Sequence, residues 1–202
     1  MQAAAPSVAG VLLAGGRATR MGGRNKAFAA VGGEAIAART IRVLRETFPQ
    51  VIVATNAPDA YAGFDVDVVA DAFPGQGPLA GLHAAMRVAR HPHVFAVACD
   101  MPGLDAGVIR LLVQRIGDAD AVVPRWDGDI EPLHAVYAVR LLPLVERCLA
   151  GGRPAMRDFL PLVRVDYVSE TELRVLAAAP ASFTNVNTPE ELEAVGGRFD
   201  DA

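Results

Sequence analysis

The chain has 202 residues, of which 52% are hydrophobic and 21% charged, enough apolar material for one sizeable core and too much for a disordered protein. Its formal net charge of −4 argues against a broad basic surface of the kind that holds nucleic acid or an anionic membrane. We therefore expect a single domain over residues 1–202, with no nucleic-acid or membrane partner and with any anion site confined to a local patch.

The two cysteines, Cys99 and Cys148, each lie within an apolar segment. That placement is typical of reduced core thiols in a cytoplasmic protein. The apolar run at residues 8–14 is too short for a membrane span, and no basic segment of a secretory signal precedes it. We expect a cytoplasmic protein.

Short β-branched runs alternate with stretches of helical periodicity, as they do in βαβ units. Apolar residues that continue almost unbroken are typical of parallel strands buried on both faces. Such runs predict strands over residues 8–14, 51–55, 66–70 and 94–99. Between and after them, helical spacing predicts helices over residues 34–48, 79–89 and 104–116.

The rest of the chain continues the alternation. Turn-forming residues at 127–129 separate two further apolar runs. Helical spacing follows the second of these runs and returns near the end of the chain. The predicted elements are strands over residues 120–124 and 133–139 and helices over residues 139–150 and 188–196. Together these elements predict an α/β, Rossmann-like fold with a mostly parallel open sheet and helices on both faces.

The loop after the first strand, GGRATRMGGRNKAF, contains Lys26, the only lysine of the chain. Its glycines let the backbone approach an anion closely, and Arg17, Arg20 and Arg24 add positive charge. A compact ammonium group suits a phosphate as a point charge better than a planar guanidinium does. The loop has neither the Walker order nor the dinucleotide order of glycines. It predicts a phosphate cradle, the alternative being a surface loop of solvated arginines.

Ligands of open α/β sheets bind beyond the carboxyl ends of the strands, so the later loops are the next candidates. Asn56 follows the second strand, Asp71 the third and Asp100 the fourth. The Asp100 carboxylate suits Mg²⁺, which takes one or two carboxylates together with phosphate oxygens and water; the alternative is a turn or helix-capping role. Pro78 is predicted to begin a helix.

The histidines show no spacing to Cys, Asp or Glu that suggests a metal site. We expect each of the four histidines to be a surface or packing residue: His83, His91, His93 and His134. The one metal that we expect is Mg²⁺.

LAGGRATRMGGRNKA, at residues 13–27, resembles the L-A-G-G-x-x-x-R-M-G-x-x-K signature of nucleotidyltransferases. Three more segments are similar to motifs of the molybdenum cofactor guanylyltransferases, so the resemblance covers almost the full length. These segments are VVADAFPGQGPLAGL (68–82), ACDMP (98–102) and FTNVNTPEEL (183–192). The resemblance implies a fold like that of the nucleotide-diphospho-sugar transferases.

It also implies that GMP is transferred from GTP to molybdenum-bound molybdopterin, with Mg²⁺ as cofactor and pyrophosphate as second product. The N-terminal part then binds the nucleotide and the C-terminal part mainly the acceptor, with transient contacts to proteins that donate or receive the molybdenum cofactor. The resemblance assigns the nucleoside to Leu13, Ala14, Gly15, Gly16, Asn56 and Asp71. It assigns the triphosphate and catalysis to Arg20, Lys26 and Asp100, and the metal to Asp100. The acceptor is assigned to Asn185 and Asn187.

Three alternatives stay open: a cytidylyltransferase for the same pterin, a sugar-phosphate nucleotidyltransferase, and a non-catalytic nucleotide-binding module. The related cytidylyltransferases typically have alanine where Gly15 stands, which favours guanine here. The chain departs from the family at Glu131, where an amide is frequent, and we assign no role to that residue.

Overall fold

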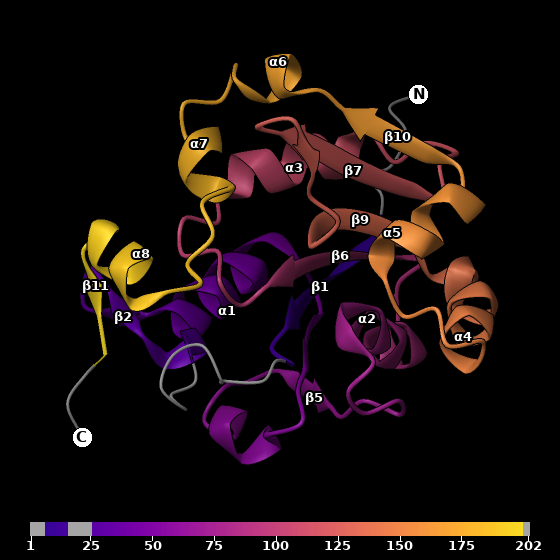
Figure 1. Ribbon diagram of the computed structural model, residues 1–202, viewed down its shortest axis with the longest axis horizontal. Coiled ribbons are helices and arrows are strands. Elements are labelled where there is room, and N and C mark those ends of the chain that lie inside the picture. The colour runs from indigo at the N-terminus through magenta and orange to yellow at the C-terminus, as the bar shows by residue number, and fades with distance from the viewer. Residues whose placement is uncertain (1–6, 16–25, 200–202) are drawn as a thin grey trace.

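The computed structural model describes residues 7–15 and 26–199, and within those ranges the main sheet has eight strands (Figure 1). They are β1 (Val8–Leu13), β4 (Val51–Ala54), β5 (Asp67–Val69), β6 (His93–Ala98), β7 (Ala121–Trp126), β8 (Asp129–Ile130), β9 (His134–Ala138) and β10 (Val165–Val168). The order across the sheet is β10-β7-β9-β6-β1-β4-β5, with β8 paired to β7.

The four strands predicted first, β1, β4, β5 and β6, are adjacent and parallel, as the apolar runs indicated. Every residue of β1 and β4 is buried. β10 runs parallel to β7, whereas β9 is antiparallel to both of its neighbours, β6 and β7. The prediction of a mostly parallel open sheet is therefore confirmed.

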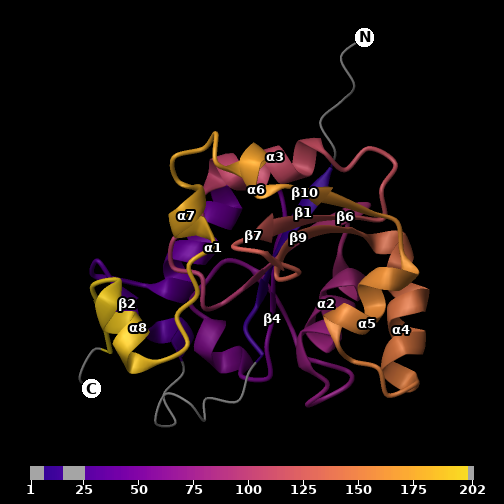
Figure 2. The same cartoon turned by 45° about the horizontal axis from the view of Figure 1, so that its top comes forward.

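Helices cover both faces of this sheet. α1 (Ile36–Thr47) and α3 (Ala106–Gln114) share one apolar core with the sheet, whereas α2 (Gly77–Val88) and α4 (Leu142–Ala150) share the core on the opposite face. Pro78 lies in the first turn of α2, as predicted, where its missing N–H costs no helical hydrogen bond. In both views α4 lies far from α8 (Pro189–Ala194), at the opposite side of the molecule (Figure 2).

A three-stranded sheet lies beside the main one and pairs the C-terminal end of the described chain with the hairpin that precedes α1. It consists of β2 (Ala30–Val31), β3 (Glu34–Ala35) and β11 (Gly197–Arg198), in the order β11-β2-β3. The prediction of a helix from residue 34 was wrong at its start, because Gly32 and Gly33 both have positive φ and close a tight hairpin. The helix begins only at Ile36.

Short elements complete the fold, and most of them carry too few residues for a period to be visible in the sequence. The 3-10 turns are η2 (Lys26–Phe28), η3 (Pro58–Tyr61), η4 (Val139–Leu141) and η5 (Leu160–Leu162), and the short helices are α5 (Met156–Phe159), α6 (Glu170–Leu173) and α7 (Ala179–Ser182). The predicted helix over 139–150 is thus η4 followed by α4. No helix among the described residues is long and apolar enough to cross a membrane.

Gly103 lets the turn after β6 pack directly on α7. A Cβ at this position would lie 2.1 Å from the carbonyl oxygen of Ala181. Two residues after Gly103, the Asp105 N–H donates to the Ser182 hydroxyl at 3.2 Å. The close approach therefore fixes the chain that leads from α7 toward residue 187.

We predict that Gly103→Ala lowers the free energy of unfolding by roughly 1–3 kcal/mol, because backbone atoms cannot move aside as a flexible side chain can. Gly63→Ala is the control: nothing lies within 4 Å of its added methyl, and its effect should stay within about 0.5 kcal/mol. Urea denaturation of both variants measures the difference. Equal midpoints would contradict the proposed packing constraint.

Candidate functional site

The parallel strands end at one edge of the sheet, where three of them are followed by polar side chains. Asn56 lies two residues after β4, Asp71 two residues after β5, and Asp100 two residues after β6. Because β5, β4 and β6 belong to one parallel set, with β1 between β4 and β6, their loops lie along the edge where open α/β folds bind ligands. The sequence prediction that these residues share an edge is confirmed.

Asn56 and Asp71 hold each other in place. The Asn56 side-chain amide donates to Asp71 Oδ2 at 3.2 Å, and the Asp71 backbone N–H donates to Asn56 Oδ1 at 3.2 Å. Burial raises the pKa of the Asp71 carboxyl, with the Asn56 hydrogen bond opposing that effect. The pair therefore presents a fixed, partly desolvated acceptor at the end of β5.

Two glycines face the same carboxylate. A methyl group at Gly15 would lie 3.7 Å from Asp71 Oδ2, and one at Gly81 would lie 3.8 Å from Asp71 Oδ1 and 3.1 Å from Leu13. Ala14 continues the parallel pairing, since its N–H donates to the Ala54 carbonyl at 2.9 Å. We call Leu13, Ala14, Gly15, Asn56 and Asp71 the nucleoside cluster. It is a backbone-lined surface with one carboxylate.

Lys26, Asp100 and Asn187 form a second group, which we call the lysine junction. Lys26 Nζ donates to Asp100 Oδ2 at 2.6 Å and to Asn187 Oδ1 at 3.2 Å. The side chains of Lys26 and Asp100 are 28% and 17% exposed, so the ion pair is partly shielded from water but still reachable. The structure thus joins the signature loop, the C-D-M-P turn and the N-V-N-T-P segment at one nitrogen atom.

The C-terminal arm of the junction is anchored by backbone contacts. The Val186 N–H donates to the Asp100 carbonyl at 2.8 Å, and the Asn187 N–H donates to Glu191 Oε2 at 2.6 Å. Thr188 and Glu191 form a capping box that starts α8. Asn185, two residues before Asn187, is half-buried and makes no side-chain hydrogen bond with the described residues.

The two carboxylate oxygens of Asp100 differ in their hydrogen bonding. Oδ1 is buried and has no hydrogen-bond partner among the described residues. Burial raises the pKa of the neighbouring Cys99 thiol to about 11, and the negative charge of Asp100 contributes to this shift. Cys99 is therefore protonated near neutral pH and is no nucleophile.

His134 and Glu131 come from the chain that leads into β9 and differ in their surroundings. The His134 ring lies between those of Phe95 and Phe183, at centroid distances of 5.3 and 4.6 Å. Complete burial lowers the His134 pKa to about 3, so it is the uncharged packing residue that we expected. Burial raises the pKa of Glu131, as do the charges of Asp129 and Asp100.

The described residues leave part of the sequence prediction without a structural account. Gly16 and Arg20 lie outside them, as do Arg17 and Arg24. The contact that sequence reasoning missed is the one between Lys26 and Asn187, because a hydrogen bond across 161 positions leaves no local pattern. Only the N-V-N-T-P resemblance pointed to that segment.

The family model of the MobA-like NTP transferase domain matches residues 10–165. This chain belongs to the MobA-like NTP transferase family. It is 41% identical over 183 residues to a probable molybdenum cofactor guanylyltransferase of Pelotomaculum thermopropionicum, covering 91% of this chain and 89% of the relative. It is 37% identical over 188 residues to a molybdenum cofactor guanylyltransferase of Desulfosudis oleivorans, with 93% of each covered.

Solved structures agree with the MobA-like assignment. Molybdopterin-guanine dinucleotide biosynthesis protein A from Archaeoglobus fulgidus superposes with a TM-score of 0.76 at 27% identity, over 92% of this chain and 95% of the other. The 2-C-methyl-D-erythritol 4-phosphate cytidylyltransferase of Thermus thermophilus, at 18% identity and a TM-score of 0.67 over 92% and 95% of the two chains, shares the fold. The expected nucleotide-diphospho-sugar transferase fold is confirmed.

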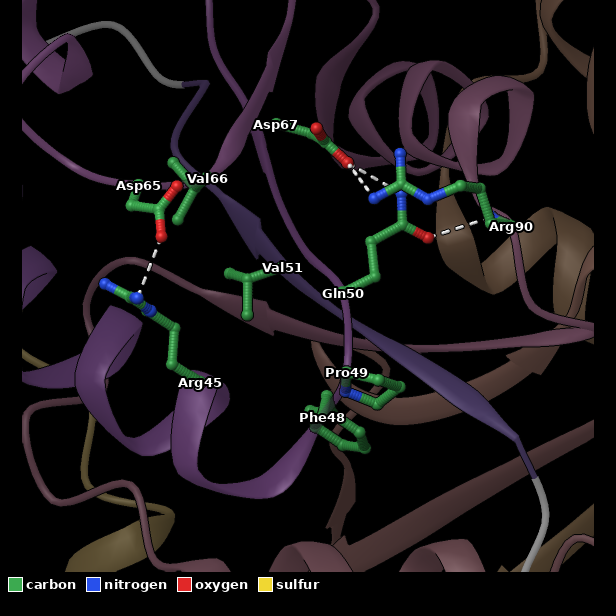
Figure 3. Close-up of a pocket in the computed structure, with 9 residues that line it drawn as sticks. All are labelled: Arg45, Phe48, Pro49, Gln50, Val51, Asp65, Val66, Asp67 and Arg90. Carbon is green, nitrogen blue, oxygen red and sulfur yellow. Dashed lines mark hydrogen bonds and ion pairs between the residues drawn. The ribbon is translucent and has the colours of Figure 1, made fainter.

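A polar hollow of about 450 Å³ at the opposite edge of the sheet does not suit the triphosphate that a MobA-like protein binds (Figure 3). Arg45 is paired there with Asp65, and Arg90 with Asp67, at 3.0 and 3.1 Å. The buried Gln50 amide also donates to Asp67, at 2.8 Å. In this hollow the two arginines are matched by two aspartates, so the hollow offers no surplus positive charge to an anion.

Proposed function

We propose that this protein transfers GMP from GTP to molybdopterin that carries molybdenum, forming the guanine dinucleotide cofactor and releasing pyrophosphate. The observation that carries the proposal is the lysine junction, in which one ammonium group joins three segments that resemble guanylyltransferase motifs. The names of the relatives that are 41% and 37% identical support the same reaction.

The reaction needs no nucleophile from the protein. A terminal phosphate oxygen of the acceptor attacks the α-phosphorus of GTP, a new P–O bond forms, and the bond to the β-phosphate bridging oxygen breaks with its electron pair leaving on pyrophosphate. The acceptor phosphate is already an anion at neutral pH, so catalysis consists of positioning and of charge stabilisation. Lys26 donates protons in hydrogen bonds to phosphate oxygens on which charge increases.

Asp100 fits the role of a magnesium ligand. Its Oδ1 is a buried carboxylate oxygen without a partner among the described residues, while Oδ2 is held by Lys26. The described residues contain no group of three or more His, Cys, Asp or Glu side chains suited to a metal. Mg²⁺ nevertheless accepts a site with one carboxylate that is completed by substrate phosphates and water. Bound Mg²⁺ would neutralise phosphate charge and polarise the reacting phosphoryl group.

We assign the nucleoside cluster to guanosine. The Watson–Crick edge of guanine carries N–H donors at N1 and N2, and Asp71 is a carboxylate acceptor fixed by Asn56. Cytosine presents one donor, N4–H₂, beside an acceptor at N3, so a carboxylate gains one hydrogen bond there and meets one repulsion. Leu13, Ala14 and Gly15 complete the cluster through their backbone, and the family resemblance adds Gly16. By the same resemblance Arg20 joins Lys26 at the triphosphate, and Asn185 and Asn187 serve the acceptor.

We further propose that residues 1–202 work as a single nucleotidyltransferase domain in the cytoplasm, in transient contact with proteins that donate or receive the cofactor. The described cysteines, Cys99 and Cys148, are unpaired, which agrees with a reducing compartment.

Incubation with GTP, ATP, CTP and UTP separately, each with Mg²⁺ and molybdenum-loaded molybdopterin, tests the function. Mass spectrometry of the products should identify the guanine dinucleotide, formed at least about tenfold faster than any other. Equal use of CTP would identify a cytidylyltransferase or an unselective enzyme. Binding of nucleotide without any transfer would instead identify a non-catalytic module.

Gly15→Ala tests base selection. The added methyl has room, at 3.7 Å from Asp71 Oδ2, so the fold tolerates it, but it stands beside the carboxylate that accepts from the purine. We expect the ratio of kcat/KM for GTP to that for CTP to fall by about tenfold, the scale of one misplaced methyl group. Competition between the two nucleotides measures the ratio, with Gly63→Ala as control. An unchanged ratio would show that this turn does not select the base.

A further inference from the structure

A small groove opens beside the lysine junction. Its volume is about 160 Å³, and the side chains or backbone that line it come from β2, α1, α7, the turn after β6, and the chain on either side of α8. We call it the Arg39 groove; its lining includes Arg39, Val31, Pro102, Gly103, Thr184 and Val195. Apart from Arg39 this lining carries no charge, so a ligand there meets mostly apolar surface.

Arg39 has unused hydrogen-bonding capacity. It is the one arginine in residues 7–15 and 26–199 that is half-buried; every other arginine there is exposed. No hydrogen bond or ion pair links its guanidinium to the residues that the structure describes. By contrast Arg42, on the same helix, is paired with Glu34 and Glu46 at 3.0 and 3.5 Å. The charge of Arg39 acts on Glu34, whose pKa is lowered chiefly by the Arg42 hydrogen bond and also by Arg39, but no acceptor among the described residues contacts the Arg39 guanidinium. Its N–H donors are therefore available to a ligand.

The groove is lined by residues that are close to the junction along the chain. Pro102 is two residues from Asp100, so their Cα atoms are at most about 7.6 Å apart. Thr184 directly precedes Asn185, and the Val186 N–H donates to the Asp100 carbonyl at 2.8 Å. None of the lining residues belongs to the nucleoside cluster. A ligand in the groove therefore lies next to the phosphate chemistry without competing for the base site.

Resting on the proposed function, we propose that the Arg39 groove binds the pterin ring of the acceptor. The volume is well below the several hundred Å³ of a site that encloses a whole drug-sized ligand, and suits one small ring system. The flat faces of a pterin match the apolar surfaces of Val31, Pro102 and Val195. The Arg39 guanidinium donates to the carbonyl oxygen on the edge of the ring, as arginine does to the carbonyl of guanine.

Steady-state kinetics of Arg39→Ala test the assignment, with Arg42→Ala as the control on the same helix. At saturating GTP, loss of a charged donor should raise the KM for molybdenum-loaded molybdopterin about tenfold or more, with kcat and the KM for GTP nearly unchanged. Arg39→Lys, which keeps the charge but loses the planar fork, should lie between wild type and Arg39→Ala.

Two results overturn the groove assignment while leaving the proposed function intact: an unchanged KM for the acceptor, or a raised KM for GTP, which would assign Arg39 to the nucleotide. A wild type that transfers no GMP contradicts the proposed function instead.

A free pterin tests the ring by itself. In the wild type, 6-hydroxymethylpterin should inhibit competitively with the molybdenum-loaded acceptor and not with GTP, and Arg39→Ala should raise its inhibition constant about tenfold. Inhibition competitive with GTP, or the same inhibition constant in both proteins, would show that the ring binds elsewhere.

Discussion

The ion pair between Lys26 and Asp100 is the contact on which the phosphate and acceptor parts of the site depend. It connects the loop after β1 to the turn after β6, and through Asn187 it takes in a segment 161 positions further along the chain. A carboxylate and an ammonium group 2.6 Å apart stabilise each other while the substrate is absent. Because both remain partly accessible, the same charges are available to a phosphate and to a metal ion.

Much of the remaining fold serves to bring the third member of this contact into place. Gly103 allows α7 to approach the turn after β6, β11 pairs with β2, and the capping box at Thr188 fixes the start of α8. These three constraints hold residues 183–188 across the end of the sheet. The nucleoside cluster, by contrast, needs only the parallel strands and the Asn56–Asp71 pair. Nucleotide binding and acceptor positioning thus depend on different parts of the structure.

The sequence predicts the central sheet well because burial on both faces leaves an unbroken apolar run, as in β1 and β4. It also predicts that Asn56, Asp71 and Asp100 share an edge, since that follows from parallel strands. The two-residue strands β2, β3 and β11 escaped prediction for two reasons. β2 and β3 form a local hairpin that is too short to show an alternating pattern, and β11 pairs with β2 from the other end of the chain. The partnership of Lys26 with Asn187, and the unpaired state of Arg39, are likewise properties of the folded chain and leave no local signal.

The most direct test of the central claim is the rate of pyrophosphate release by Lys26→Ala, compared with Lys26→Arg and wild type at saturating GTP, Mg²⁺ and acceptor. Removing the ammonium group should lower kcat by about a hundredfold or more, as removal of one preorganised donor does elsewhere. Lys26→Arg should recover only part of that loss, because a planar guanidinium replaces a compact charge. Thermal denaturation shows whether each variant is folded. Wild-type turnover by a folded Lys26→Ala protein would contradict the claim that this lysine organises the reaction.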